Sequence, residues 1–358
     1  EPLAELSTSA SEAVLAPLGA DVIGLNPFHA PCSDSPDAAS PYSPSDRRFL
    51  NPLYIAPEGV DEYRAEFAEK NTKALEWLRR EALVDYEKVS RLKYQLYENL
   101  YGEFSRCHQS VASSSLRQFE DFVAGQGEPL ASFCAYEVVH NAYADQFAAE
   151  PRFYAYLQWL AFSQLQQCQQ LALAKGMKIG LMGDIAVGSV NQGNEVKSNP
   201  DIYRSGATIG APPDPFSSSG QDWGLPVIDP LSLRQSHYRH FIQLLRANLS
   251  CYGAIRIDHA MSLMRLWWCL AEEGELQRAG AYVYFPIQDM LALLRLESHR
   301  GRCQVIGEDL GVVPWEFREL MQANGMMGNT VFYFEQDYQH NFRSPHEHRE
   351  PVALMVTN

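Results

Sequence analysis

The sequence has no run of eighteen consecutive apolar residues and no basic segment followed by an apolar one at its N-terminus. The first absence argues against a membrane-spanning helix, and the second argues against a secretory signal. The sequence also lacks a G-x-G-x-x-G stretch and a P-loop, which removes the usual nucleotide-binding patterns. We therefore expect a soluble, cytoplasmic protein that binds no nucleotide through either motif.

Paired cysteines are missing too, and positive charge is scarce. The seven cysteines are odd in number and form no C-x-x-C pair, so we expect reduced core residues without disulfides or bound metal. The 29 lysines and arginines are outnumbered by 44 aspartates and glutamates, which gives a net charge of −15. Such a field repels phosphates, and we expect neither a nucleic acid nor a membrane as a partner. The oligomeric state stays open.

What the chain does contain is a repeated order of helix and strand. Its 358 residues, 46% of them apolar, suffice for one large α/β domain or two smaller ones. Apolar residues at helical spacing predict helices at 4–18, through 60–176, at 229–249, at 286–299 and after Pro314. Short apolar runs predict six strands, at 22–25, 178–182, 254–257, 305–307, 330–334 and 352–356.

Strands that alternate with helices form a parallel sheet. Polar side chains follow the strand ends repeatedly, namely Asn26, Asp184, Asp258, Glu308 and Asn358. Active sites of (β/α)8 barrels collect at that rim, so the pattern favours an α/β fold of the TIM-barrel type over an open doubly wound sheet.

The composition divides the chain into three parts. We expect a barrel start with a substrate loop at 1–59, a helical insertion at 60–176, and a catalytic barrel portion at 177–358. Residues 30–56 are rich in Pro, Ser and Asp and predict an ordered loop. Residues 187–226, dense in Gly, Pro, Ser and Asn, predict an active-site loop.

Asp258 and Glu308 are the candidate catalytic pair. Each ends a buried strand, and strand ends of parallel neighbours meet at one rim, where two carboxyl groups can work on a sugar acetal. Strand alternation places Arg256 beside Asp258, which favours an ionised nucleophile. The strand before Glu308 is uncharged from Gln304 to Gly307, which favours the raised pKa of a proton donor.

Simpler interpretations remain open for each of these residues. Asp258, Asp184 and Asp309 can be helix caps or turn residues, and we interpret Asp309 as a cap. Glu308 alone can be an ion-paired surface residue, and His259 a packed histidine. A separation of roughly 5 Å between the two carboxyl groups predicts a retaining reaction, and roughly 6.5–9.5 Å an inverting one.

The segment 210–226 carries aromatic, amide and acidic side chains between prolines and glycines. Such side chains suit sugars, which present apolar C–H faces and hydroxyl rims. A surface loop with one aromatic residue tucked into the core explains the same pattern. Trp267 and Trp268 lie in an apolar run and are interpreted as core residues.

At these residues the chain resembles the 4-alpha-glucanotransferases (amylomaltase, or disproportionating enzyme) of the alpha-amylase clan. The resemblance extends over the whole sequence. It rests on the stretches 23–30, 40–43, 51–55, 183–188, the Gly-Ala-Pro-Pro-Asp and Gly-Gln-Asp-Trp-Gly-Leu-Pro stretches within 210–226, 256–259 and 306–311. Any one of them is weak by itself, but together they are specific.

The resemblance implies retaining transfer on maltooligosaccharides and α-1,4-glucans without a metal or organic cofactor. Asp258 resembles the nucleophile and Glu308 the acid/base, with Arg256, Asp184 and His259 in support. The positions that match sugar contacts are Asn26, His29, Tyr42, Asp214, Phe216, Gln221 and Trp223.

The family's third catalytic carboxylate lies in an Asn- or Thr-His-Asp motif after the seventh strand, and this sequence reaches that motif's first residue at Asn358. By the same comparison, strands two to seven of a barrel are present and strands one and eight are missing. We therefore expect a fragment that is poorly active alone. A hydrolase or debranching relative and a glucan-binding module without turnover remain alternatives, whereas a metal hydrolase lacks the necessary His or Cys cluster.

Overall fold

The computed structural model describes residues 15–107, 113–144, 150–213, 217–270, 280–348 and 351–355. The chain forms two compact units. One, called the sheet unit below, comprises Val22–Pro27, Ile179–Asn191 and Asn199–Asn358. The other, called the helical unit, comprises Glu1–Asp21, Phe28–Lys178 and Gln192–Ser198.

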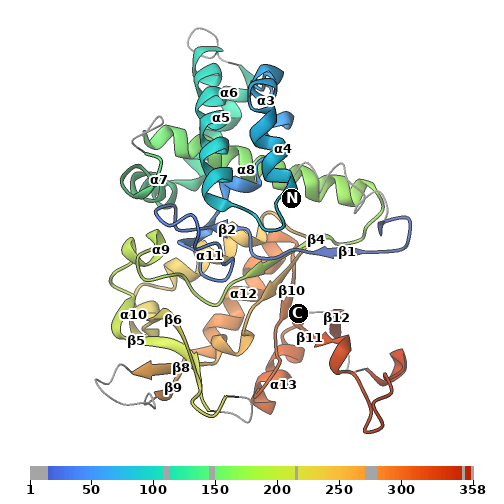
Figure 1. Ribbon diagram of the computed structural model, residues 1–358. Coiled ribbons are helices and arrows are strands. Elements are labelled where there is room, and N and C mark those ends of the chain that lie inside the picture. Colours follow the sequence, from blue (N-terminus) through green and yellow to red (C-terminus); the bar gives the residue numbers. More distant parts are fainter. Residues whose placement is uncertain are drawn as a thin grey trace. The chain divides into compact units, whose positions relative to one another are not determined.

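The sheet unit is built on six parallel strands in the order β1-β4-β7-β10-β11-β12 (Figure 1). Their bounds are Val22–Gly24, Gly180–Ile185, Ala254–Ile257, Gln304–Gly307, Met327–Val331 and Val352–Met355. The order in space follows the order along the chain, as expected when each strand returns through a connecting segment. The predicted six-stranded parallel sheet is confirmed, and the fold is mixed α/β.

One face of this sheet holds an apolar cluster. Met182, Ala254 and Ile306 are buried there, and Met327 packs against them from β11. Since side chains alternate along a strand, the residues two positions further on point to the same face. On β4, β7, β10 and β11 those residues are polar or charged, so the apolar layer lies beneath a polar one.

Helices follow several of these strands. They are α10 (Pro230–Gln235), α11 (Arg239–Leu249), α12 (Ile287–Gly301) and α13 (Trp315–Ala323). The predicted helix 229–249 is interrupted, because His237 and Tyr238 adopt positive φ angles of 55° and 57° between α10 and α11. Asp229 caps α10, as its carboxylate accepts a hydrogen bond from the backbone N of Leu231.

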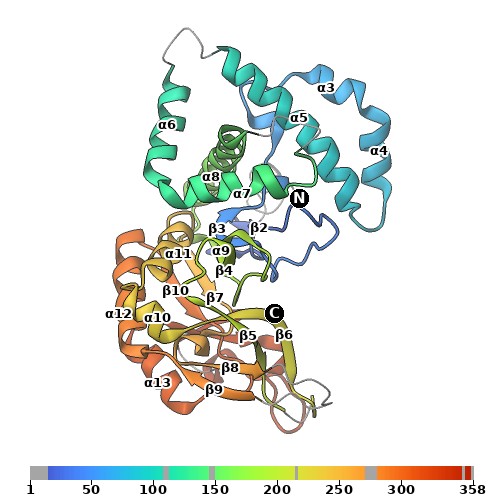
Figure 2. The ribbon, with the colours of Figure 1, turned by 90° about the vertical axis from the view of Figure 1, so that its left-hand side faces the viewer.

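A second, antiparallel sheet of the sheet unit has the order β6-β5-β8-β9 (Figure 2). Its strands are β5 (Tyr203–Ala211), β6 (Gln221–Ile228), β8 (Arg265–Leu270) and β9 (Gly280–Tyr284). The prediction of a loop over 187–226 was therefore wrong where β5 and β6 lie, at 203–211 and 221–226. Gly210 lets the backbones of β5 and β6 approach closely, since a Cβ at this position would lie 2.0 Å from the carbonyl oxygen of Gln221.

The helical unit contains seven α-helices within the described residues. They are α3 (Ala65–Lys70), α4 (Thr72–Arg80), α5 (Tyr86–Cys107), α6 (Ser114–Gln126), α7 (Glu128–His140), α8 (Pro151–Ala174) and α9 (Asn194–Lys197). We predicted no strand for 60–176, and the described part of that range contains none. Aromatic rings of α5, α6 and α8 pack together in the helical unit, where the ring centroids of Phe104 and Tyr156 lie 4.9 Å apart.

The segment 30–56 is ordered, as predicted, but it is not only loop. β2 (His29–Ala30) pairs with β3 (Asp46–Leu50), and two 3-10 turns follow at Pro52–Tyr54 and Pro57–Gly59. Buried ion pairs hold β3, where Arg47 meets Glu195 and Arg48 meets Asp46 at 2.8 Å. The amide of Gln158 on α8 satisfies both the N–H and the C=O of Leu50.

Two further strand predictions differ from the structure. Asp184 lies inside β4 rather than after it, because the strand continues to Ile185. The predicted strand 330–334 begins earlier as β11, and Phe332–Phe334 form a 3-10 turn in which Tyr333 and Phe334 are exposed. The predicted helix 4–18 lies largely outside the described residues.

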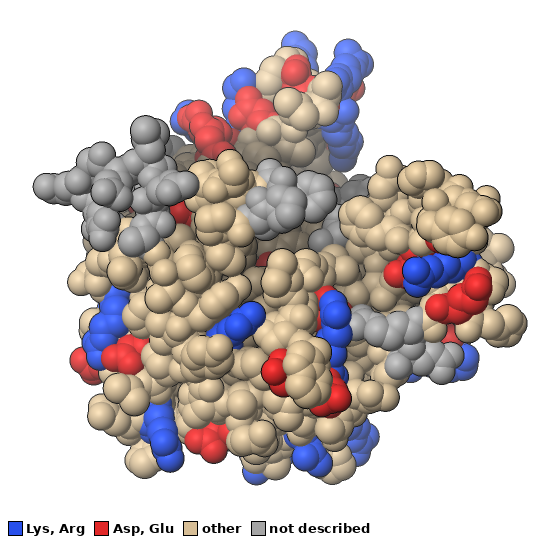
Figure 3. All heavy atoms as spheres, turned by 90° about the horizontal axis from the view of Figure 1, so that it is seen from below, with Lys and Arg blue, Asp and Glu red and all other residues tan. Residues whose placement is uncertain are grey.

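Within the described ranges, no helix has the length and apolar character needed to cross a bilayer. All seven cysteines lie in the described ranges, where no disulfide joins them, and six of them are buried. Figure 3 shows one face of the molecule, on which acidic and basic side chains are interspersed rather than gathered by sign.

Candidate active site at the strand ends

Three neighbouring strands bring four charged side chains to one edge of the parallel sheet. The register of β4 with β7 pairs Asp184 with Arg256. Asp258 directly follows β7, and Glu308 directly follows β10. Because the last residues of β7 and β10 pair with each other, Asp258 and Glu308 are the next opposed positions. The sequence-predicted carboxylates therefore share one rim of the sheet.

Arg256 connects two of the carboxylates. Its Nη1 lies 2.9 and 2.8 Å from the two carboxylate oxygens of Asp184 and 3.0 Å from Oδ1 of Asp258. The side chains of Arg256 and Asp184 are both 6% exposed. The predicted placement of Arg256 and Asp258 on one side of the strand is confirmed by this contact. Asp184 thus lies within β4, and its carboxylate accepts hydrogen bonds from this guanidinium.

The protonation of Asp258 is set by two opposing effects. Burial raises the pKa of its carboxyl above the ordinary value, and the Arg256 guanidinium opposes that rise. The sequence had indicated only the second effect. The structure adds burial, which is the larger of the two effects, so the pKa of Asp258 lies above that of a solvated aspartate.

Glu308 is fixed by backbone donors. Its Oε2 accepts a hydrogen bond from the N–H of His259 at 3.0 Å, and its Oε1 accepts one from the N–H of Leu310 at 2.6 Å. Burial is the largest influence and raises the pKa of Glu308, the charge of Asp258 adds to the rise, and the two backbone donors oppose it. The predicted upward direction of this pKa agrees with these contacts.

His259 adopts a left-handed conformation with φ 48°. That conformation is uncommon for a residue with a side chain, and it aims the His259 N–H at Glu308. Its ring lies 5.2 Å from the ring of Trp223, edge to face. Burial lowers the pKa of the imidazole to about 4, so it is neutral near pH 7. His259 is thus both a packed histidine and a backbone donor to the candidate acid.

The residues predicted to contact sugar are distributed differently. Trp223 lies on β6, where its Nε1 donates to Oε1 of Gln221 at 3.0 Å, and Gln221 is exposed. The Trp223–His259 contact connects β6 to the rim. Asn26 is exposed two residues after β1, the strand next to β4. Asp214 and Phe216 lie outside the described residues.

His29 and Tyr42 belong to the helical unit. His29 is a buried residue of β2, and Tyr42 is 37% exposed in the turn before β3. The predicted contacts of these two residues with sugar stay predictions.

Two residues at this rim have roles that the sequence did not indicate. Asp309 is not a helix cap, since α13 begins only after Pro314. Its carboxylate instead accepts hydrogen bonds from Nε of Arg318 at 3.1 Å and from the backbone N of Asn329 at 3.0 Å. Asn329, on β11, is 1% exposed. The signal for Asn329 in the sequence was a polar residue within a predominantly apolar strand, and the register places it opposite Glu308 on the neighbouring strand.

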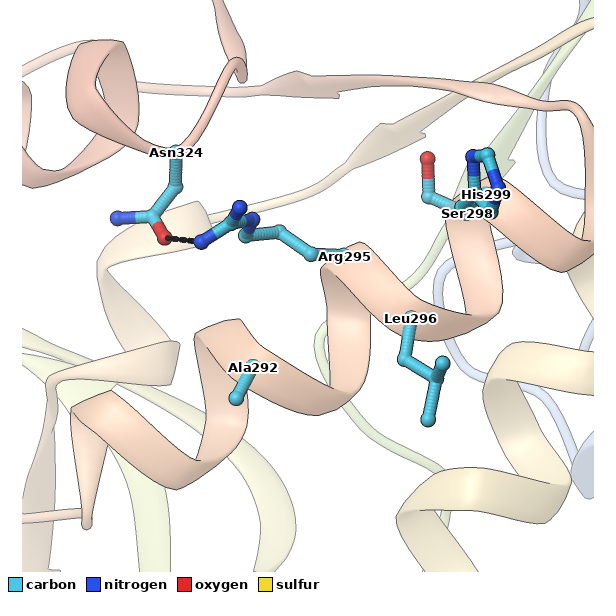
Figure 4. A pocket seen from close by; sticks show the side chains of 6 residues that line it. All are labelled: Ala292, Arg295, Leu296, Ser298, His299 and Asn324. Atoms are coloured by element: carbon cyan, nitrogen blue, oxygen red, sulfur yellow. Dashed lines mark hydrogen bonds between the residues drawn. The ribbon is translucent and has the colours of Figure 1, made fainter.

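A surface hollow of about 560 Å³ lies between α12 and α13 and is lined by Ala292, Arg295, Leu296, Ser298, His299 and Asn324. In Figure 4, Arg295 reaches from α12 toward Asn324, whose Oδ1 accepts its hydrogen bond at 3.4 Å, while Leu296 points away. The hollow shares no residue with the strand-end cluster. No group of three His, Cys, Asp or Glu side chains suited to a metal ion occurs among the described residues.

With this geometry in view, comparison with known proteins is informative. The profile of the 4-alpha-glucanotransferase family matches residues 8–149 and 139–358. The 4-alpha-glucanotransferase of Haemophilus influenzae is 35% identical over 361 residues, which cover 89% of this chain and 51% of the relative. That of Mycobacterium bovis is 31% identical over 353 residues, which cover 89% and 48%.

Solved structures agree with the sequence relatives. The amylomaltase of Corynebacterium glutamicum superposes with a TM-score of 0.85 at 29% identity, covering 100% of this chain and 52% of that one. The amylomaltase of Streptococcus agalactiae in complex with acarbose gives 0.74 at 18% identity, covering 97% and 73%, which shows similarity of fold. This chain belongs to the 4-alpha-glucanotransferase family. It spans about half the length of the curated relatives that it matches.

Proposed function

We propose that this chain, as a member of the 4-alpha-glucanotransferase family, carries the nucleophile and the acid/base for moving α-1,4-glucan segments between maltooligosaccharides. The observation that carries the proposal is the opposition of Asp258 and Glu308 on adjacent strands, with Arg256 bound to Asp258. Family membership supports the substrate class. No metal or organic cofactor enters the proposed reaction.

The strand geometry favours retention of configuration. Adjacent strands lie roughly 4.8 Å apart, and opposed residues of parallel strands point to the same face. Retaining enzymes place their two carboxyl groups about 5–5.5 Å apart, whereas inverting enzymes leave roughly 6.5–9.5 Å for a water molecule. Asp258 and Glu308, as register neighbours, fit the shorter spacing.

The proposed reaction has two displacement steps. In the first, a carboxylate oxygen of Asp258 bonds to the anomeric carbon, the glycosidic C–O bond breaks, and Glu308 gives its proton to the leaving oxygen. In the second, the 4-hydroxyl of an acceptor sugar attacks that carbon, its proton passes to Glu308, and the ester bond to Asp258 breaks. Two inversions retain the configuration.

The environment of each carboxyl suits its step. The raised pKa of Glu308 favours the protonated acid that the first step requires. Arg256 favours the ionised form of Asp258, which burial otherwise opposes. Once the Asp258 charge is consumed in the ester, its upward effect on the pKa of Glu308 ends, and Glu308 more readily loses its proton to become the carboxylate that accepts a proton in the second step.

Further assignments follow from the same proposal. Asp184 and His259 position Arg256 and Glu308, and the residues for glucan contact are Asn26, His29, Tyr42, Asp214, Phe216, Gln221 and Trp223. The six parallel strands are part of a (β/α)8 barrel, supported by their sequential order and by the likeness to the Corynebacterium glutamicum amylomaltase. Residues 60–176 are a helical insertion in that barrel, and 177–358 carry its catalytic portion. We place the protein in the cytoplasm.

Incubation with maltotriose followed by chromatography tests the proposal. The parent chain is expected to yield glucose together with maltotetraose and longer products at a low rate, since we expect it to be poorly active alone, and Asp258→Asn is expected to yield none of them. Asp61→Asn, an exposed aspartate of the helical unit, is the matched control and keeps the parent's products. Glucose and maltose without longer products would indicate hydrolysis instead. Maltotriose binding without any product in the parent would contradict transfer.

A further inference from the structure

Asn329 lies beside the proposed catalytic pair. β10 and β11 are adjacent (Figure 1). Their register pairs Gly307 with Gly328, so Asn329 is opposite Glu308. Met327, two residues earlier, packs against the apolar cluster that contains Ile306. Strand alternation therefore aims the Asn329 side chain at the sheet face that carries Asp258 and Glu308.

The Asn329 side chain is buried, and its polar atoms are unpaired in the part of the chain that the structure describes. It is 1% exposed, and neither Oδ1 nor Nδ2 has a hydrogen-bond partner among the described residues. Most buried polar groups are hydrogen-bonded. A buried amide without a partner lowers the stability of the folded state, and an apolar side chain of similar shape at the same position would raise it. The backbone of Asn329 is fixed meanwhile by the carboxylate of Asp309.

We propose that Asn329 binds a hydroxyl group of the glucose unit that lies between Asp258 and Glu308. A sugar hydroxyl both donates and accepts, and a carboxamide offers one acceptor and two donor hydrogens, so the ligand supplies what the protein does not. The identity of the ligand rests on the proposed function. Asn329 would then determine specificity, because a glucose analogue without that hydroxyl leaves the amide unpaired again.

Binding and stability are measured together in an Asp258→Asn background, where the ligand stays intact. Maltotriose affinity is followed by calorimetry, and unfolding by urea titration. Both Asn329→Leu and Asn329→Ala are expected to weaken binding roughly tenfold, the equivalent of one hydrogen bond. Asn329→Leu is also expected to unfold at a higher urea concentration than its parent.

Asn248→Leu is the matched control. Asn248 is a buried asparagine on α11 whose Nδ2 donates to the carbonyl oxygen of Leu244 at 2.9 Å. Its replacement is expected to lower stability and to leave maltotriose affinity unchanged. A purely structural Asn329 would behave in the same way as Asn248.

The inference would be overturned if maltotriose affinity were unchanged in both Asn329 variants. It would also be overturned if Asn329→Leu lost as much stability as Asn248→Leu. In either case the proposed function would stand. Absence of maltotriose binding in the Asp258→Asn chain itself would contradict the proposed function, and with it the ligand assigned to Asn329.

Discussion

Glu137 on α7 is expected to make the stability of the protein fall as the pH rises. This glutamate is 4% exposed, and burial raises the pKa of its carboxyl from 4.5 to about 7. Asn141, whose Nδ2 donates to Oε2 at 3.2 Å, and Ser33 oppose the rise, whereas the carboxylates of Asp34 and Asp46 add to it. Glu137 is therefore an ionisable group that the fold keeps protonated well above the usual range.

The magnitude follows from the two pKa values. Because the folded state holds the proton more tightly, the contribution of Glu137 is fully present below the unfolded pKa and is lost as the pH rises through about 7. A shift from 4.5 to about 7 is 2.5 pH units, which at about 1.36 kcal/mol per unit gives roughly 3 kcal/mol. Replacement by glutamine keeps the shape and removes the titration.

Urea unfolding followed by helical circular dichroism provides the assay. Between about pH 4.5 and pH 8, Glu137→Gln is expected to gain roughly 3 kcal/mol of unfolding free energy relative to the parent. Glu128→Gln, an exposed glutamate on the same helix, is the control and should follow the parent. A difference between Glu137→Gln and the parent that is the same at both pH values would refute the reasoning.

Two other substitutions test the packing and charge of the strand-end rim. Arg256→Met leaves Asp184 and Asp258 without their shared cation and is expected to lower the unfolding free energy by about 3–5 kcal/mol near neutral pH, and by less in acid, where the carboxylates protonate. Urea titrations at two pH values measure this, and an equal loss at both would contradict it. Gly307→Ala would place a Cβ 2.7 Å from Cε of Met321 and 2.9 Å from Cβ of Ala260, with an expected loss of about 1–3 kcal/mol. Gly102→Ala, in open space on α5, is expected to raise the melting temperature, and a lower one in both variants would disprove the packing argument.

The sequence predicted the parts of the site that depend on short-range pattern. Strand periodicity placed Arg256 and Asp258 on one side, and the contact at 3.0 Å agrees. The uncharged strand before Glu308 predicted the direction of its pKa. Both inferences need only neighbouring residues and the two-residue period of a strand.

Long-range pairing explains where prediction failed. β2 pairs with β3 across a segment rich in proline and serine, and β5 pairs with β8, which lies more than fifty residues further along the chain. Loop-like composition hides such strands, because glycine and proline are also used where backbones approach closely or sheets bend. The role of Asp309 was missed for the same reason, since one of its partners, Asn329, is on the next strand.

The backbone conformation and the burial of single residues could not be predicted from the sequence either. The left-handed conformation of His259 follows from the contacts of its N–H and ring, and no local pattern requires it. Asn329 became informative only once its register neighbour and its buried, unpaired amide were known.

Covalent trapping tests the central claim most directly. In Glu308→Gln, α-maltotriosyl fluoride can still react, because fluoride leaves without a proton from an acid, whereas the second step is slowed by the missing base. Mass spectrometry of the digested protein is expected to show a glycosyl ester on the peptide that contains Asp258, and none when Asp258→Asn is added. An ester on another residue, or one that persists with Asp258→Asn, would contradict the account.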